Sequence, residues 1–434
     1  MPEHLLAGLM VPALMLLIFL GFPVALSLIV VAFAFAVPVF GDIAGLQLSN
    51  FVGQVASNYV LAAVPMFVFT GAVLERSRIA EGLFAAMRLW LERAPGGLAL
   101  ATIAMAAIFA AGTGIVGAVE VMVGMMAIPP MMKARYSNEL IAGTICAGGS
   151  LGTIIPPSIV VVIYASYANL SVGDLLAGIL VPGLMMVAFF MIYIVVRGWR
   201  EQRWRGAGAE PEMPAVPLGE KLRITIVALV PPVLLMVAVL GSIFTGVAAV
   251  TEAAAIGCVG VLLLALVYRQ LSVKLVWDAL AVTSRLTAMI LLIVVGGTMF
   301  TSIFIVHHGA ELVGSMIAAL GLGETGVILV LLTIVFLLGA VLDWVSVLTI
   351  CLPIFIPILR GTSIDPIWFG VLTIIVIQTS YLTPPMAPSI FYLRAIAPSS
   401  MTFGDMYRGV VPFIAAQLAV LAVLLVFPQL LAWV

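Results

Sequence analysis

The sequence predicts an all-α polytopic membrane protein, built as an inverted repeat with two re-entrant helical hairpins and two broken transmembrane helices. The first observation behind this prediction is composition: of 434 residues, 64% are hydrophobic and only 9% are charged. A soluble domain has about 45–50% apolar and about 25% charged residues. A soluble fold is therefore excluded, and the lipid bilayer is the expected surrounding. The other two observations are a repeated proline pair and the placement of the basic residues.

The proline pairs lie in long apolar segments, Pro156-Pro157 in G-T-I-I-P-P-S and Pro384-Pro385 in S-Y-L-T-P-P-M, at a spacing of 228 residues (384 − 156). A proline ring removes a backbone donor and clashes with the preceding turn, so each pair should break its helix. Broken helices are tolerated at membrane depth only where protein buries them or where they line a wet cavity. Two such breaks at matching positions indicate the midplane binding site of a secondary transporter.

The order of the elements follows from the apolar segments. Residues 5–38 are too long for one ordinary span, and Gly21-Phe22-Pro23 marks a break within them. The other segments expected in the first half are a crossing at 51–74, a polar stretch at 75–95, an interrupted segment at 98–132, a proline-broken helix at 139–166 and a crossing at 174–196. After a polar linker, the second half has segments at 224–244, 250–268, 285–306, 309–320, 326–359, 366–393 and 410–433.

These segments predict a division of the chain into six parts. The parts are N-terminal scaffold helices (1–74), repeat 1 with its hairpin at about 98–132 and broken helix at about 139–166 (75–196), a cytoplasmic linker (197–223), further scaffold helices (224–284), repeat 2 with its hairpin at about 326–359 and broken helix at about 366–393 (285–408), and a C-terminal helix (409–434). The segments at 75–95 and 269–285 are expected to brace the boundary between the scaffold and the repeats.

The two halves match beyond the proline pairs. Ile128-Pro129 corresponds to Ile356-Pro357, and Tyr164 corresponds to Tyr392, at the same spacing of 228 residues (356 − 128, 392 − 164). Agreement at one spacing, within the same order of segments, predicts an internal duplication.

The basic residues predict how the repeats are oriented. If the segment 98–132 is a hairpin that enters and leaves on the cytoplasmic side, every Lys and Arg except Arg360 lies on that side, as the positive-inside rule requires. The segment 326–359 then enters from the opposite face, so the repeats are inverted. Inverted repeats can form two nearly equivalent arrangements, one open to each side, which is the basis of alternating access.

The hairpin tips and the breaks offer backbone and hydroxyl oxygens at membrane depth. The tips are Gly112 to Gly117 and Gly339 to Ser346, and the breaks follow the segments 148–153 and 378–383. A hard cation such as Na⁺ takes oxygen ligands, and half-helix ends add partial charge. The alternatives are close helix packing by small residues and simple proline kinks compensated by Ser and Thr.

Three carboxylates lie in apolar surroundings, where an ionised group costs at least about 2.5–3.5 kcal/mol on insertion scales. Asp343, at the second tip, is the best candidate for an ion-linked carboxylate. Glu120 follows the first tip and could face substrate or pair with a scaffold group. Glu252 begins an apolar run, which favours a helix N-terminal role, and His307 and His308 are expected at a membrane interface.

Several classes of activity lack their motifs. The chain contains no G-x-x-x-x-G-K-[ST], no H-E-x-x-H and no Cys/His cluster, so no ATP hydrolysis, no other enzymatic activity and no cofactor are expected. Cys146, Cys258 and Cys351 are expected to be small core residues. No nucleic-acid partner is expected, and the N-terminus lacks the basic region of a cleavable signal peptide.

Nearly the whole chain resembles the large membrane subunit of tripartite ATP-independent periplasmic (TRAP) transporters, the DctM-like family. The matching stretches are Pro65-Met66-Phe67 with Gly71, Ala94-Pro95-Gly96-Gly97, G-G-S-L-G-T-I-I-P-P-S at 148–158, T-E-A-A-A-I-G at 251–257, G-A-V-L-D at 339–343, P-I-F-I-P-I at 353–358, D-P-I-W-F-G at 365–370 and L-T-P-P at 382–385. One difference is the first tip, which reads G-T-G-I-V-G-A-V-E where many relatives have Ser and Thr. This difference leaves the usual acidic-sugar or C4-dicarboxylate substrate open.

The resemblance implies an elevator-type transporter of the ion transporter superfamily that imports a small organic acid across the bacterial inner membrane with Na⁺. Its implied partners are a separate small four-helix membrane subunit and a periplasmic substrate-binding protein. A binding-protein-independent sodium/carboxylate symporter of similar fold, and a channel, remain the alternatives.

Carried over to this sequence, Na⁺ lies at the tips and breaks and the substrate lies between them. The implied ion-binding positions are Thr113, Gly114, Gly149, Ser150, Thr153, Pro156, Gly339, Asp343, Thr379, Ser380, Thr383 and Pro384. The implied substrate-binding positions are Gly112, Gly117, Glu120, Ser158, Ser346, Gln378 and Tyr381.

Overall fold

The protein is α-helical throughout its described part, in a computed structural model that describes residues 3–77, 79–113, 116–205, 216–319, 321–360 and 362–431. Seven helices of this part are long and apolar enough to cross a membrane. The hairpins and broken helices are built mainly from shorter helices, because each crosses only part of a bilayer or is interrupted within it.

The N-terminal region begins with helices joined by short turns. Its elements are α1 (Glu3–Phe19), α2 (Val24–Phe40), α3 (Ala44–Ala56) and α4 (Ala63–Arg76). The expected break at Gly21 is confirmed by the turn between α1 and α2. The expected single crossing at 51–74 is wrong, because Asn58 accepts a hydrogen bond from the Val60 N–H at 3.1 Å and donates one to Ser166 at 2.8 Å, and the chain turns there.

Repeat 1 is built from an amphipathic helix, a hairpin, a broken helix and a long crossing. These elements are α5 (Ile79–Leu91), α6 (Gly97–Thr113), α7 (Val116–Lys133), α8 (Asn138–Ser150), α9 (Ile159–Ala168) and α10 (Val172–Arg205). Two further helices, α11 (Leu218–Phe244) and α12 (Val250–Val267), lead to α13 (Val273–Val306). The segment 269–285, expected to brace the boundary between the scaffold and the repeats, is largely the first part of α13, which Ser272 caps by accepting from the Leu275 N–H.

Repeat 2 contains a second hairpin and a second broken helix. After α14 (Gly309–Ala319), its elements are α15 (Glu324–Gly339), α16 (Trp344–Leu359), α17 (Pro366–Leu382), α18 (Pro388–Ile396) and α19 (Phe403–Val426). The first residues of α6 to α10 and of α15 to α19 are 227, 228, 228, 229 and 231 residues apart, taken in order. This agreement, over five successive helices, confirms the duplication expected from the sequence.

The two repeats pack crosswise. Hairpin α6–α7 packs on α8, while α15 of the other hairpin packs on α17. The second half of each broken helix packs on the hairpin of the other repeat, since α18 contacts α7 and α9 contacts α16. Both breaks therefore lie where the repeats meet.

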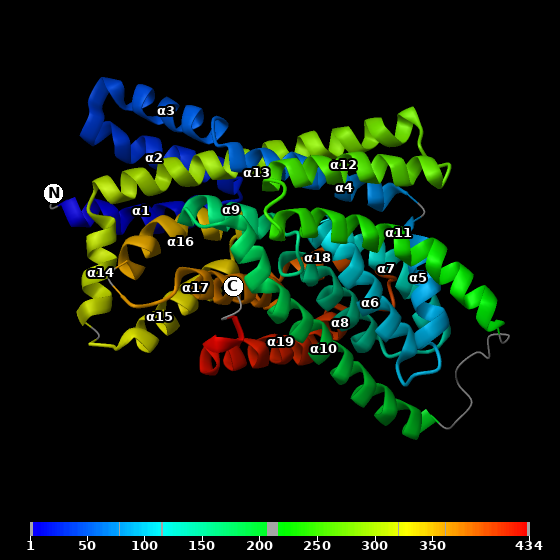
Figure 1. Ribbon diagram of the computed structural model, residues 1–434. Coiled ribbons are helices and arrows are strands. Elements are labelled where there is room, and N and C mark those ends of the chain that lie inside the picture. Colours follow the sequence, from blue (N-terminus) through cyan, green and yellow to red (C-terminus); the bar gives the residue numbers. More distant parts are fainter. Residues whose placement is uncertain are drawn as a thin grey trace.

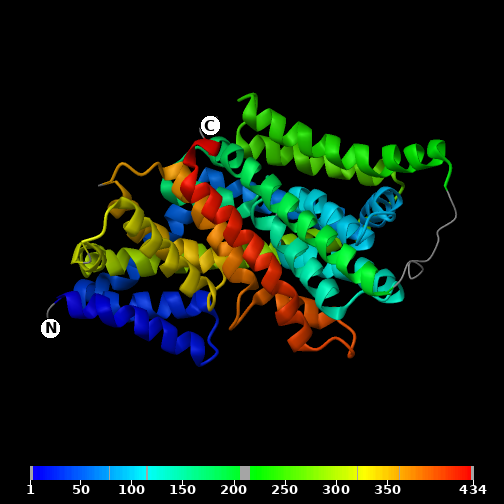
Figure 2. The same cartoon turned by 90° about the horizontal axis from the view of Figure 1, so that it is seen from below.

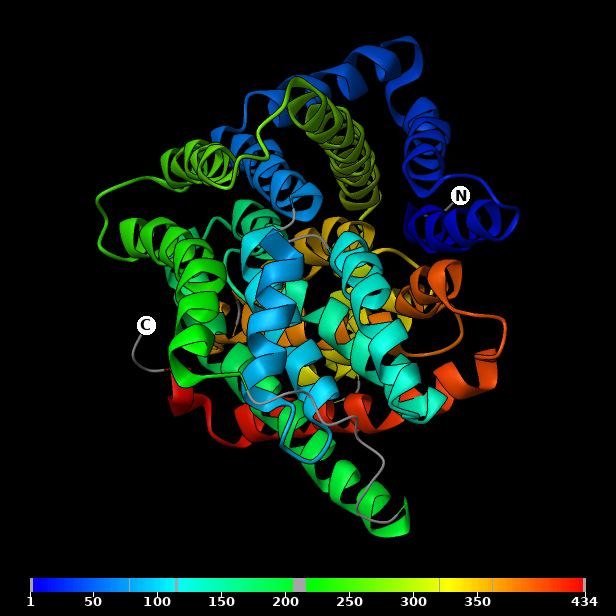
Figure 3. The same cartoon turned by 90° about the vertical axis from the view of Figure 1, so that its right-hand side faces the viewer.

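The remaining helices line one side of this bundle. Figures 1 and 3 show α1, α2, α3, α12 and α13 along that side, with α13 running its full length. Helix α13 packs on α2, α4 and α16, which connects the N-terminal helices to the second hairpin. On another face of the bundle, α19 crosses obliquely beside α10 (Figure 2) and packs on α8 and α17.

Candidate ion and substrate site

The first break is closed by hydrogen bonds between its own residues. Helix α8 ends at Ser150, a 3₁₀ turn spans Leu151–Thr153, and α9 begins at Ile159. The Ser158 hydroxyl donates to the Thr153 carbonyl at 2.6 Å, and the Thr153 hydroxyl donates to the Ser150 carbonyl at 2.9 Å. Ser150, Thr153, Pro156 and Ser158 are all buried. The chain is interrupted here as expected, and hydroxyl groups satisfy carbonyls that the interruption would otherwise leave unpaired.

The second break is exposed. Helix α17 ends at Leu382 and α18 begins at Pro388, and the prolines 384 and 385 between them are exposed. The hydroxyls of Thr379, Ser380 and Thr383 each donate to a carbonyl three or four residues earlier. The Met386 N–H donates to the Ala340 carbonyl at 3.4 Å, so this break lies against the tip of the second hairpin.

Asp343 caps α16 at this second tip. Its Oδ2 accepts from the backbone N–H groups of Val345, at 3.0 Å, and Ser346, at 3.2 Å, and its Oδ1 accepts from the Ser346 hydroxyl. A carboxylate has about four acceptor positions, and three are used here. The tip also lies tightly against α17, because a Cβ added to Gly339 would overlap the hydroxyl of Ser380.

The first tip is described only in part. Gly114 lies outside the described residues, and Thr113 is the last residue of α6. Gly112 is half-buried against Leu74. On the other side of the tip, a Cβ added to Gly117 would lie 2.8 Å from the ring of Tyr392 on α18, so only glycine allows this close approach.

Glu120 is fully buried at the junction of three helices. Its Oε1 accepts from the Ser389 hydroxyl of α18 at 2.7 Å, and its other oxygen has no hydrogen-bond partner within the described residues. A Cβ added to Gly149 of α8 would lie 2.6 Å from the Glu120 Cβ. In this conformation, then, the carboxyl joins the first hairpin to the broken helix of the other repeat.

Tyr381 and Tyr392 lie on either side of the second break. Tyr381 is buried near the end of α17, and Tyr392 is 45% exposed on α18. Because the ring of Tyr392 lies against Gly117, α18 meets the flank of the first tip.

A second polar cluster lies between the repeats. The Gln378 amide donates to the Ser150 hydroxyl at 3.1 Å, and these two residues are themselves 228 positions apart. Equivalent positions of two repeats can touch only at the pseudo-two-fold axis that relates them, so this contact marks the axis. The Gln417 amide of α19 also donates to Ser150, at 3.4 Å. Neither Gln378 Oε1 nor Gln417 Oε1 has a hydrogen-bond partner among the described residues.

Sequence reasoning missed Gln417 and Ser389. Gln417 is a lone amide in the apolar run I-A-A-Q-L-A-V, and this isolation was a signal that could have identified it. Ser389 has no such signal, because a serine after a Pro-containing break is ordinary. Only the packing of α18 on α7 places its hydroxyl on the Glu120 carboxyl.

The other polar predictions have separate outcomes. Glu252 caps α12 as predicted, because its carboxylate accepts from the Ala249 N–H at 2.8 Å. His308 is exposed and pairs with Glu311 at 3.1 Å, but His307 is buried rather than interfacial and bonds the Phe35 carbonyl at 2.9 Å. Its place on α13 puts it against α2, which the sequence could not show.

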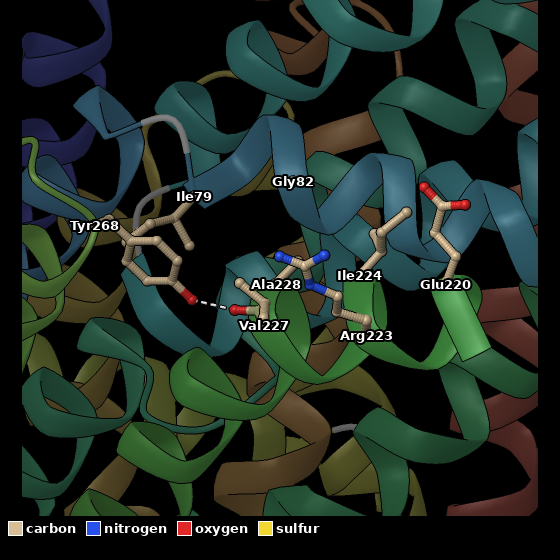
Figure 4. Close-up of a pocket in the computed structure, with 8 residues that line it drawn as sticks. All are labelled: Ile79, Gly82, Glu220, Arg223, Ile224, Val227, Ala228 and Tyr268. Atoms are coloured by element: carbon tan, nitrogen blue, oxygen red, sulfur yellow. Dashed lines mark hydrogen bonds between the residues drawn. The ribbon is translucent and has the colours of Figure 1, made fainter.

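Two surface pockets lie away from the predicted site. One, of about 410 Å³, lies between α5 and α11, where Ile79, Arg223 and Tyr268 are among its lining residues. Figure 4 shows the Tyr268 hydroxyl directed at the Val227 carbonyl, to which it donates. The other, of about 470 Å³, lies between the first turns of α15 and α17 and the C-terminal segment.

Comparison with known proteins gives one consistent result. Residues 11–430 match the family described as "Tripartite ATP-independent periplasmic transporter, DctM component". The chain is 31% identical over 378 residues to the C4-dicarboxylate TRAP transporter large permease protein DctM of Pseudomonas aeruginosa, covering 86% of each chain. It is 30% identical over 428 residues to the ectoine/5-hydroxyectoine TRAP transporter large permease protein UehC of Ruegeria pomeroyi, covering 96% of each.

Two further likenesses extend this result. The sialic acid TRAP transporter large permease protein SiaM of Vibrio cholerae is 28% identical over 414 residues, covering 95% of this chain and 94% of that protein. The YdaH transporter of Alcanivorax borkumensis has a similar fold, with a TM-score of 0.63 over 99% of both chains at 15% identity. At that identity the likeness concerns the fold alone.

Proposed function

Because the chain belongs to the DctM family of tripartite ATP-independent periplasmic transporters, we propose that it imports a small organic acid across the bacterial inner membrane by coupling to sodium. The relatives are named for a C4-dicarboxylate, for ectoines and for sialic acid, which are small, polar and carboxylate-bearing. The shared chemistry of these substrates supports a small organic acid as the substrate class but does not identify one compound.

The second hairpin tip supports sodium as the coupling ion. Asp343 holds a negative charge at the N-terminus of α16 with one acceptor position left over, and it lies beside the interrupted backbone of the second break. Oxygen ligands of mixed charge in flexible backbone suit a hard monovalent cation. The ion-binding positions named from the sequence at this tip and break are therefore proposed as the sodium site.

The difference between the two breaks supports alternating access. The two breaks are equivalent in the duplicated chain, yet residues 156–158 are buried while residues 384–386 are exposed. The helices that follow the two breaks also differ in exposure. Helix α9 is buried over its first seven residues, whereas Phe391 and Tyr392 of α18 are 52% and 45% exposed. Inverted repeats in unequal environments represent one of two exchangeable states.

Helix α18, which follows the exposed break, packs on α7 of the first hairpin. The basic residues place this hairpin's entrance in the cytoplasm. We therefore assign the described conformation to the inward-open state. In the elevator motion that we propose, the bundle of hairpins and broken helices moves against α2, α4, α12 and α13 to reach the other state.

The proposed partners are a small membrane subunit and a periplasmic binding protein that delivers the substrate. Reconstitution in liposomes tests this assembly: the chain is inserted with and without the two partners, and uptake of the binding protein's own ligand is measured. We expect uptake only with all three proteins and an inward sodium gradient, with potassium at equal ionic strength as the control. Uptake by the chain alone would favour the self-sufficient symporter, and flux that survives collapse of the sodium gradient would favour a channel.

A further inference from the structure

The groove between α5 and α11 combines an apolar floor with two opposite charges. Its apolar lining comes from Ile79 on α5 and from Ile224 and Ala228 on α11, and its volume is about 410 Å³. Glu220 and Arg223 also line it, one turn apart on α11. In Figure 4 both charged side chains extend from α11 toward α5. The groove is therefore amphipathic along its length.

The two charges are exposed and are not paired with each other. Within the described part of the chain, neither Glu220 nor Arg223 has an ion-pair partner or a side-chain hydrogen bond, whereas the neighbouring Lys221 donates to the Leu89 carbonyl at 2.9 Å and lies over the Trp90 ring. Residues three apart on a helix are about 5–6 Å apart at Cβ. A ligand with a positive and a negative group at a similar separation can therefore contact both side chains at once.

The position of the groove places it at the inner membrane surface. It lies at the first turns of α11, which follow the cytoplasmic linker, and beside Tyr268, which precedes Arg269 and Lys274. Trp90 of α5 donates to Thr225 at 2.8 Å nearby, and Trp is typical of the membrane–water interface. Helix α11 is exposed along most of its length, with large apolar side chains such as Ile226, Val230 and Leu234 outward. An exposed apolar helix face of this kind is suited to contact with the acyl chains of lipids.

We propose that this groove binds a phospholipid with an ethanolamine headgroup from the inner leaflet. The phosphate contacts the Arg223 guanidinium, which is suited to phosphate oxygens, and the primary ammonium contacts the Glu220 carboxylate. An acyl chain lies against Ile79, Ile224 and Ala228. The lipid joins α5, which precedes the first hairpin, to α11, which lies beside the scaffold helices, and so stabilises their contact.

The headgroup is fixed by complementarity of charge. A phosphatidylglycerol satisfies Arg223 but leaves Glu220 without a cation. A phosphatidylcholine carries a positive charge, but its three methyl groups remove every N–H donor, so it cannot hydrogen-bond a carboxylate. Of these three headgroups, only ethanolamine supplies an anion and an N–H-bearing cation together, and it adds no further negative charge beside Glu220.

Lipid competition on the purified full chain tests the proposal. The detergent-solubilised protein is incubated with equal amounts of phosphatidylethanolamine, phosphatidylglycerol and phosphatidylcholine of the same acyl chains, and the retained lipid is counted by mass spectrometry. We expect the parent to retain phosphatidylethanolamine preferentially. Arg223→Gln should lower the retained lipid about tenfold, which corresponds to about 1.4 kcal/mol of binding free energy, because the phosphate loses its guanidinium partner.

Two further variants test the assignment of each charge. Glu220→Gln should lose the preference for phosphatidylethanolamine over phosphatidylglycerol while still retaining lipid, because Arg223 remains. The matched control Lys274→Gln removes an exposed cation of the same side that does not line the groove, and should leave both quantity and preference unchanged.

The proposal is overturned if the parent shows no preference, if Lys274→Gln and Arg223→Gln lose lipid equally, or if Glu220→Gln keeps the parental preference. If Arg223→Gln does not fold, Ile224→Trp, which fills the groove from a half-buried position, replaces it and should displace the lipid. Retention of phosphatidylethanolamine by Ile224→Trp would then count against the groove as the binding site. None of these measurements requires transport, so they do not depend on the proposed function.

Discussion

Replacing Asp343 with Asn separates the two roles that the structure gives this carboxylate. As an N-cap, Asp343 accepts from the N–H groups of Val345 and Ser346, and Asn caps helices as well as Asp does. Without sodium, the free energy of unfolding of the Asn variant should therefore stay within about 0.5 kcal/mol of the parent. Asp343→Ala, which removes the cap as well, should cost about 0.5–2 kcal/mol.

The loss of charge should instead weaken sodium binding. A ligand at 100 times its dissociation constant stabilises a protein by about 2.7 kcal/mol. If removal of the carboxylate charge weakens sodium at least tenfold, which is about 1.4 kcal/mol, the stabilisation at the same sodium concentration falls to about half. Asp343→Asn should therefore fold normally but lose much of the sodium-dependent rise in unfolding temperature.

The assay is thermal unfolding in detergent with increasing sodium, using potassium to hold the ionic strength constant. Asp405→Asn is the matched control, because Asp405 is an exposed carboxylate in the first turn of α19 that bonds the Thr402 N–H at 2.9 Å. The control should keep the full sodium response. A parental sodium response in the Asp343→Asn variant would remove Asp343 from the ion site and leave it only as a helix cap.

Two other predictions concern the first break and its packing. Changing Pro156 and Pro157 together to Ala should let α8 and α9 become continuous and should weaken sodium binding at least several-fold in the same thermal assay. The control Pro182→Ala, within the continuous helix α10, should leave sodium binding unchanged. Unchanged sodium affinity in the double variant would argue against a role for the break. Gly149→Ala should lower the free energy of unfolding by about 1–3 kcal/mol, because the added methyl group would overpack against the buried side chain of Glu120. The control Gly219→Ala, with open space around it, should not lower it. Equal stability of the two variants would contradict the packing described here.

Much of the fold was predictable because its determinants are local. Pro156-Pro157 and Pro384-Pro385 each interrupt their helix, as the missing N–H and the ring clash predict, but a proline pair alone does not decide this, because Pro129-Pro130 and Pro231-Pro232 lie within the helices α7 and α11. The spacing found between the two proline pairs also relates, to within a few residues, five successive helices of the first repeat to five of the second. The exception, near Asn58, was a turn set by one amide side chain in an apolar context, which hydropathy does not detect.

The candidate site was predictable only as a set of segments. Asp343 was identified because a carboxylate in an apolar run is costly and stands out in the sequence. Gln417 and Ser389 were not identified, since their importance comes from contacts with Ser150 and Glu120 on distant segments. Contacts across several hundred residues have no local signature.

The sequence by itself determined that this chain lies in a membrane and that it is duplicated, because composition and a repeated spacing are properties of the chain that do not depend on which residues are neighbours in space. Only the tertiary structure decided that α18 packs on α7, that residues 150 and 378 meet on the symmetry axis, and that one break is buried while its equivalent is exposed. Equivalent elements of the two repeats can occupy unequal surroundings, and those surroundings come from packing, which depends on the whole chain at once.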